Sequence, residues 1–410
     1  MSGAAGAEAA TGSAPLVPLR RNRGFRLLWT GQVVSGTGTD AAFIAYPLLI
    51  LALTHSPAIA GLVSTVAMAV ELGLGLPGGA LSDRLDRRLT MIVCDAGRAA
   101  LLALLTALVL LHLVTWPVVL AVAVIDGGAF VLFDPAAGAA LSAIVADGQL
   151  EQAWARTQAS TYAAGLAGPA LGGFLFGLGR AVPFAGDAAS YLFSAAAVSR
   201  IRGTFQADPA AGRKALWREI IDGLHLVWHN PVLRAVAIRA PLINFAFTGA
   251  IFTITLALRR HGTAPGTIGL AQAAIGAGGL LGAMIAPRLQ GRLRPRRMVI
   301  VMTTAGTTLF GAAALLIPSA LVAIPVAASI LLAPAANAAM LAATMRAAPK
   351  EMRGRVNSTM LQASLGLTAL APLTSGLLVE HFSGHWAMAA FAAAMGTAAI
   401  LTIAMPWPRA

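Results

Sequence analysis

Three carboxylates lie inside long apolar runs of the sequence, where a charged side chain is costly. Asp40 and Asp126 lie midway along the first and the fourth of these runs, and Glu71 lies in the second. In lipid, such a side chain must face protein or a water-filled cavity, which makes each acid a functional candidate. A carboxyl there could bind and release a proton near cellular pH. The structural alternative for each is a satisfied hydrogen bond or an ion pair to a neighbouring helix.

Other polar side chains interrupt the same kind of run. Asp95 and Arg98 stand three residues apart, a spacing at which the two side chains of one helix can pair. Four more are candidates to contact a small molecule in a central cavity, with helix packing as their alternative role: Gln32, Arg239, Asn244 and Asn337.

The elements that position these groups are membrane-spanning helices. Of the 410 residues 58% are hydrophobic and 11% are charged, well below the charged fraction of about 25% in a soluble domain. Uncharged runs of the length needed to cross a bilayer as a helix recur along the chain. They predict an all-α protein with twelve transmembrane helices, near 27–53, 57–81, 90–114, 117–140, 155–178, 183–200, 232–257, 266–287, 298–317, 320–343, 356–380 and 386–406.

Basic residues are concentrated in alternate connections between these spans. Placing the N-terminus in the cytoplasm puts 24 of the 29 lysines and arginines on the cytoplasmic side and three outside: Arg180, Arg259 and Arg260. The positive-inside rule then predicts that both termini are cytoplasmic. The net charge of +13 is dispersed in short clusters rather than gathered on one surface, so no nucleic-acid partner is expected.

The longest interior break divides six spans from six. We expect a disordered tail over 1–24, an N-terminal six-helix bundle over 25–201, a cytoplasmic linker with an interfacial helix over 202–231, and a C-terminal six-helix bundle over 232–410. A repeat supports the division, because QASTYAAGLAGPALGGFL from Gln158 resembles QASLGLTALAPLTSGLL from Gln362. Repeated halves of this kind are typical of secondary transporters.

The stretch GGALSDRLDRR after the second span carries a family resemblance. It fits the pattern G-x-x-x-D-R-x-G-R-R of the major facilitator superfamily, with an aspartate at the usual second glycine, and the chain resembles the branch that contains the enterobactin exporter and the macrolide efflux proteins. The resemblance implies a conformational latch at this loop; the alternative is that its arginines only follow the topology rule. The matching residues are Gly79, Asp83, Arg84, Arg87 and Arg88.

A second motif, GLAGPALGG in the fifth span, is similar to the glycine-proline signature of antiporters in this superfamily. Its glycines would let helices approach closely, and its proline would bend the span. Close packing alone would also explain the glycines. The motif residues are Gly165, Gly168, Pro169, Gly172 and Gly173.

These observations together predict a secondary transporter of the bacterial inner membrane. We expect export of an amphipathic, drug-like, macrolide-like or siderophore-like molecule by proton antiport, from a monomer in the lipid bilayer, with no metal and no cofactor. The alternatives are a proton-independent carrier, an importer of the same fold, or a membrane sensor or scaffold. An enzyme is not expected, because the sequence shows no nucleophile, base and orienting group in a catalytic arrangement. The sequence also has no phosphate-binding G-x-x-x-x-G-K-[ST] loop, so transport driven directly by ATP within this chain is not expected.

Overall fold

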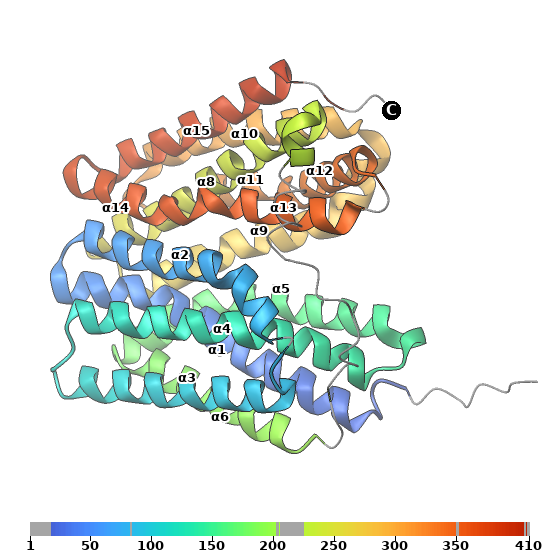
Figure 1. The fold of residues 1–410 in the computed structure, drawn as a ribbon. Coiled ribbons are helices and arrows are strands. Elements are labelled where there is room, and N and C mark those ends of the chain that lie inside the picture. The colour runs from blue at the N-terminus through green and yellow to red at the C-terminus, as the bar shows by residue number, and fades with distance from the viewer. Residues whose placement is uncertain are drawn as a thin grey trace, which may run out of the picture.

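The structure, a computed structural model, describes residues 18–82, 84–201, 205, 225–349, 352–405 and 407. Asp83, most of the predicted tail and residues 206–224 of the predicted linker lie outside these residues. The described chain is nearly all helical, and its longer helices run alongside one another in two stacked groups (Figure 1).

The first group holds six helices that correspond to the first six predicted spans. Its interior contacts join α1 to α5 and α6, α3 to α4 and α6, and α2 to α4. We call this group the N half. Its helices are α1 (Arg23–Thr54), α2 (Pro57–Ser82), α3 (Arg87–Leu110), α4 (Trp116–Ile144), α5 (Leu150–Leu178) and α6 (Val182–Ser199).

The second group, the C half, holds the remaining spans. Here α15 packs against α8 and α10, α9 packs against α11 and α12, and α14 packs against α8. Its helices are α8 (Pro231–Arg260), α9 (Pro265–Arg292), α10 (Pro295–Leu316), α11 (Ala323–Ile330), α12 (Ala333–Ala347), α13 (Arg353–Gly366), α14 (Ala371–His381) and α15 (Gly384–Ala404).

Two predicted spans are broken helices rather than continuous ones. The span near 320–343 divides into a short 3-10 turn, α11 and α12, and the span near 356–380 divides into α13, a 3-10 turn over Thr368–Leu370, and α14. Pro334 and Pro372 stand at the start of α12 and α14. Proline lacks an N–H and displaces the carbonyl one turn before it, so it is tolerated best at a helix start.

Eleven segments of the described chain are long and apolar enough to cross a membrane. The predicted span that is not among these eleven is the sixth, α6, which has 18 residues and carries Asp187, Ser190 and Ser194. These three side chains are buried inside the N half rather than directed to lipid. Large apolar side chains such as Leu110, Leu178 and Ile400 are instead more than 60% exposed, as a lipid-facing surface requires.

Both described ends of the helical chain, the start of α1 and the end of α15, lie at the same end of the helix stack (Figure 1). We call this end the terminal face. The distal face is the opposite end, and the connections it carries include 55–56, 111–115, 179–181, 261–264 and 382–383 (Figure 1). Between the halves, the closest helix pairs are α5 with α9 and α2 with α14.

Candidate functional site

A cavity of about 800 Å3 lies between the two halves, toward the terminal face. One wall comes from Thr161 and Tyr162 of α5, and the opposite wall comes from α8, α9, α12 and α13. Two of the four predicted contact residues, Asn244 and Asn337, line it, and Asn244 also donates a hydrogen bond to the carbonyl oxygen of Ser364 at 3.3 Å. No charged side chain is among the described residues that line this cavity. Its chemistry suits a molecule with large apolar surface and few charges.

Asp40 lines a smaller chamber of about 290 Å3 on the distal side of the cavity. The chamber and the cavity share Gly165, Gly276 and Ile330 in their walls. The polar residues opposite Asp40 are Thr255 of α8 and Gln272 of α9, and the Gln272 amide donates to the Thr255 hydroxyl at 2.7 Å. Asp40 therefore faces the space between the halves, and its carboxylate has no charged partner within ion-pair distance among the described residues.

The predicted glycine-proline motif of α5 packs against the backbone that carries Asp40. A Cβ at Gly168 would overlap Asp40 Cβ, and one at Gly172 would overlap the carbonyl of Ala41, so neither position has room for a side chain. The motif also reaches across to the C half, because a Cβ at Gly173 would lie 2.5 Å from the Pro265 carbonyl oxygen and 2.8 Å from Gly269 Cα. The spacing of small residues predicted close packing, whereas the partner helix α9 could not be inferred from the motif itself.

The halves also meet along α2 and α14 near the distal face. The backbone N–H of Leu373, in the first turn of α14, donates to Thr65 Oγ1 of α2 at 3.0 Å. N–H groups of a first helical turn have no partner within their own helix, so the break in this span makes the bond available. Closer to the distal face, the Glu380 carboxylate accepts a hydrogen bond from the Ser56 hydroxyl at 2.5 Å and one from the Ala58 N–H at 2.8 Å. These bonds close the distal face.

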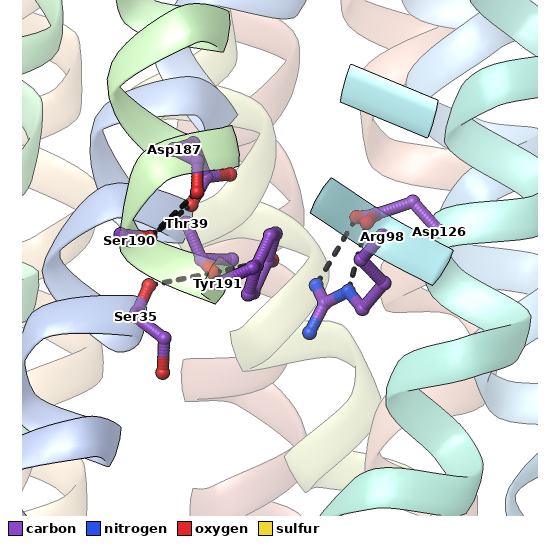
Figure 2. A network of polar contacts seen from close by, with 7 residues as sticks. All are labelled: Ser35, Thr39, Arg98, Asp126, Asp187, Ser190 and Tyr191. Atoms are coloured by element: carbon purple, nitrogen blue, oxygen red, sulfur yellow. Dashed lines mark hydrogen bonds and ion pairs between the residues drawn. The ribbon is translucent and has the colours of Figure 1, made fainter. Parts of the chain in front are cut away.

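Asp126 forms an ion pair with Arg98. The guanidinium donates to the two carboxylate oxygens at 2.8 and 3.2 Å, from α3 to α4 (Figure 2). Sequence spacing predicted that Arg98 would pair with Asp95, but among the described residues its ion pair is with Asp126, one helix away. The reason is that both acids compete for one base, and helix packing rather than spacing decides between them. An arginine inside a span was the available signal that an acid must lie near it.

Aromatic and hydroxyl groups surround this ion pair. The Arg98 guanidinium stands over the Tyr191 ring, 4.1 Å from its centroid, and the Tyr191 hydroxyl is 2.7 Å from Thr39 Oγ1 (Figure 2). The Ser190 hydroxyl donates to Asp187 at 3.0 Å, and Gly38 provides the space that lets both residues approach α1. This buried network connects α1, α3, α4 and α6 inside the N half.

Glu71 lines a third pocket, of about 240 Å3, between α2, α4 and the C half. Asp134, which is not among the predicted site residues, contributes a second carboxylate to the wall, and Gln362 contributes an amide from α13. Glu71 therefore does not share the chamber of Asp40.

The start of α3, which carries the last two arginines of the predicted latch, contacts the end of α6 and the segment that follows it. Arg87 donates to the carbonyl oxygen of Phe205 at 2.8 Å, and Arg88 donates to that of Ser199 at the end of α6. Asp86, at the position where the family pattern has glycine, caps α3 by accepting from the N–H of Leu89 at 2.8 Å. Gly79 has open space around it, and Arg84 is exposed.

Two predicted contact residues are not among those that line the central cavity: Gln32 and Arg239. Arg239 is fully buried in the C half, where its guanidinium lies 4.9 Å from the centroid of the Trp407 ring. Within the described ranges, no group of three or more histidine, cysteine or acidic side chains is arranged to hold a metal ion.

Comparison with known proteins places this geometry in a family. The model of the Major Facilitator Superfamily matches residues 28–361 and 242–409. The multidrug efflux pump Tap of Mycolicibacterium fortuitum is 27% identical over 399 residues, which cover 93% of this chain and 95% of Tap. The enterobactin exporter EntS of Citrobacter koseri is 27% identical over 304 residues, 70% of this chain and 68% of EntS.

Solved structures agree on the fold. A bacterial homolog of the human lysosomal transporter Spinster superposes with a TM-score of 0.70 at 15% identity, covering 96% of this chain and 97% of that one. The nucleoside transporter NupG gives a TM-score of 0.72 at 14% identity, with 93% and 98% covered. The predicted fold class is confirmed, as is the prediction that the protein is not an enzyme. The chain belongs to the major facilitator superfamily and is a multi-pass membrane transporter.

Proposed function

We propose that this transporter exports an amphipathic small molecule by proton antiport and that Asp40 carries the coupled proton. The observation that carries the proposal is the position of Asp40, in the chamber that adjoins the uncharged central cavity between the halves. As the halves rock, protons can reach a carboxyl in this chamber from only one side of the membrane at a time. Proton binding and substrate binding can then compete through the same conformational change.

Three further features support the proposed direction of transport and the proposed class of substrate. The motif Gly165–Gly173 resembles the antiporter signature and lies directly against the backbone of Asp40. The cavity wall is apolar with scattered amide and hydroxyl groups, which suits drug-like, macrolide-like or siderophore-like compounds. The relatives Tap and EntS are named as exporters, which favours the same direction here.

The proposed arrangement places both termini in the cytoplasm, on the positive-inside rule, so that the cavity faces the cytoplasm. The protein would act as a monomer of two six-helix bundles joined by a linker. Arg87 and Arg88 would act as the latch by holding the carbonyls of Phe205 and Ser199, where the chain enters the linker.

Among the other acids, Asp126 and Glu71 are weaker candidates for the proton. Asp126 forms a bidentate ion pair with Arg98, and removing its charge would leave a buried guanidinium unpaired. Glu71 lies in a separate pocket with Asp134. We propose that Asp126 is structural and that Glu71 would be the second choice if Asp40 is not required.

The test is substrate-dependent proton flux in everted membrane vesicles, followed with a pH-sensitive dye. A panel of lipophilic cations, macrolides and siderophores is offered to the native protein, to Asp40→Asn, and to Asp147→Asn as a control at an exposed acid. We expect one or more compounds to release protons with the native protein and the control, and Asp40→Asn to reduce that release at least 10-fold. Normal flux in Asp40→Asn would move the proton to Glu71. Accumulation of a compound without proton movement would support an uncoupled carrier, and no movement of any compound would favour the sensor or scaffold alternative.

A further inference from the structure

A pocket of about 380 Å3 on the distal face gathers the three arginines that the charge distribution leaves on that face. Arg180, Arg259 and Arg260 line it together with His55, and the other wall residues are Leu51, Ala52, Pro57 and Gly262. No carboxylate is among the described residues in its wall. This face is otherwise poor in basic residues, so the convergence of all three on one pocket is not explained by a generally basic surface.

The cationic groups come from both halves of the molecule. His55 follows α1 and Arg180 lies between α5 and α6 in the N half, whereas Arg259 and Arg260 form the last turn of α8 in the C half. Basic residues at a helix C-terminus are stabilised by the helix dipole, which accounts for the pair on α8. The dipole of α8 does not account for Arg180, which belongs to the other half.

Described neighbouring groups compensate these charges only in part. Arg259 donates to the Thr263 carbonyl oxygen at 3.4 Å, and Arg260 donates to the carbonyls of Val379 and Glu380. None of the three arginines lies within ion-pair distance of a carboxylate in the described part of the chain. The Glu380 carboxylate, although close to Arg260, is bound to Ser56 and Ala58.

We propose that this pocket binds an anion, a phosphate or carboxylate group, between Arg180 of the N half and Arg259 of the C half, and that the bound anion stabilises the closed distal face. Guanidinium groups bind both kinds of oxyanion well because their planar N–H donors match the anion geometry. Without the anion, like charges from the two halves face one another and oppose closure. A ligand that binds only the closed arrangement shifts the equilibrium toward it.

The pocket stands at the distal end of the path between the halves. Leu51 in its wall is one helical turn beyond Pro47, which lines the chamber of Asp40. An anion bound there therefore lies where the halves must separate for the chamber to open to the distal side. This regulation is independent of whether protons drive transport.

The experiment uses the full-length protein in phosphatidylcholine nanodiscs, with inorganic phosphate as the probe. In the reference samples chloride replaces phosphate at the same ionic strength and pH. Thermal unfolding is followed by intrinsic tryptophan fluorescence. At a phosphate concentration ten times its Kd, we expect the Tm to rise by about 2 °C. The double variant Arg180→Gln/Arg259→Gln should lose this rise. The matched control Arg294→Gln/Arg297→Gln, which removes two exposed arginines at the terminal face, should keep it.

A second readout measures the closure of the distal face itself. In a Cys94→Ala background, Thr65→Cys places a thiol in the interface of α2 and α14, where Thr65 is 7% exposed. At the same phosphate concentration, alkylation of this thiol should slow about 10-fold, and the Arg180→Gln/Arg259→Gln change should abolish the slowing. If the double variant does not fold, the single variant Arg180→Gln replaces it in both measurements. This change should not disturb folding, because the exposed Arg180 side chain makes no hydrogen bond or ion pair to a described residue.

Nanodiscs that contain phosphatidylglycerol distinguish a lipid headgroup from a free anion. If phosphate has no effect but phosphatidylglycerol stabilises the native protein and the control, and not the arginine variant, the anion is a lipid headgroup and the proposal stands. The proposal is overturned if neither phosphate nor phosphatidylglycerol has an effect, or if the arginine variant responds as the native protein does.

Discussion

At the scale of single residues, the described part of the N half contains one buried base, Arg98, and two buried acids. Arg98 pairs with Asp126, while Asp95 and Asp187 are also buried in the same bundle. A buried ion pair gains little net stability, but removing one partner leaves an uncompensated charge. The pair therefore accounts for Asp126, and it leaves Asp40 and Glu71 as the predicted acids that line pockets between the halves.

Removal of either partner of this ion pair should destabilise the protein. We expect Arg98→Gln or Asp126→Asn to cost about 3–5 kcal/mol, measured as a loss of Tm and of folded yield in detergent. The double change Arg98→Met/Asp126→Leu replaces the pair with apolar groups and should recover most of this loss. A double variant no more stable than the two single variants would contradict the assignment, because it would show that the pair is not the origin of the effect.

At the scale of helices, the two contacts between the halves are equivalent under the internal repeat. The repeat relates the fifth span to the eleventh and the second to the eighth, so it converts the contact of α5 with α9 into that of α14 with α2. Both are close glycine contacts. Gly173 and Gly269 approach each other's helix backbone, and Gly61 and Gly376 do the same for α14 and α2. The same device therefore closes the distal face on both sides.

Enlarging one of these glycines should open the distal face. Gly173→Leu places a side chain against the backbone of α9, and overpacking of this kind costs about 1–3 kcal/mol in the closed arrangement only. The open population should therefore rise about 5- to 150-fold, seen as faster alkylation of Thr65→Cys in the Cys94→Ala background. Gly177→Leu is the control, because this glycine, one turn farther along α5, has nothing within 4 Å of its Cβ position. Equal acceleration in both variants would argue against the contact.

How far the sequence predicts these elements depends on whether the signal is local. Hydropathy located all the spans to within a few residues, because lipid exposure requires long apolar runs. Hydropathy did not distinguish Pro372, which begins a helix, from Pro169, which lies inside one. Whether a proline interrupts a helix depends on whether neighbouring helices compensate for the lost hydrogen bond. The partners of Arg98 and Gly173 lie on other helices, so spacing along one chain segment could not identify them.

At the scale of the whole molecule, the structure shows one arrangement of two halves, closed at the distal face and hollow toward the terminal face. The bonds from Thr65 to Leu373 and from Glu380 to Ser56 join the halves at the closed side. In the alternating-access cycle that we propose, these bonds must break each time the chamber opens to the distal side. They can therefore stabilise the closed arrangement by only a few kcal/mol, or the other state would not be populated.

A reversible cross-link at the closed face should therefore stop transport. In the Cys94→Ala background, oxidation of the pair Thr65→Cys/Leu373→Cys would join α2 to α14 across the halves, and we expect it to abolish substrate-dependent proton flux until a reductant is added. The matched control is Thr253→Cys/Ser375→Cys, where the two native hydroxyl oxygens are 2.8 Å apart and both belong to the C half. That cross-link should leave flux unchanged, since a bundle that moves as one body is not hindered by an internal tie. If the protein with the oxidised cross-half pair keeps its full substrate-dependent proton flux, the distal contact of α2 with α14 does not separate during transport. The model in which the two halves rock against each other would then be wrong.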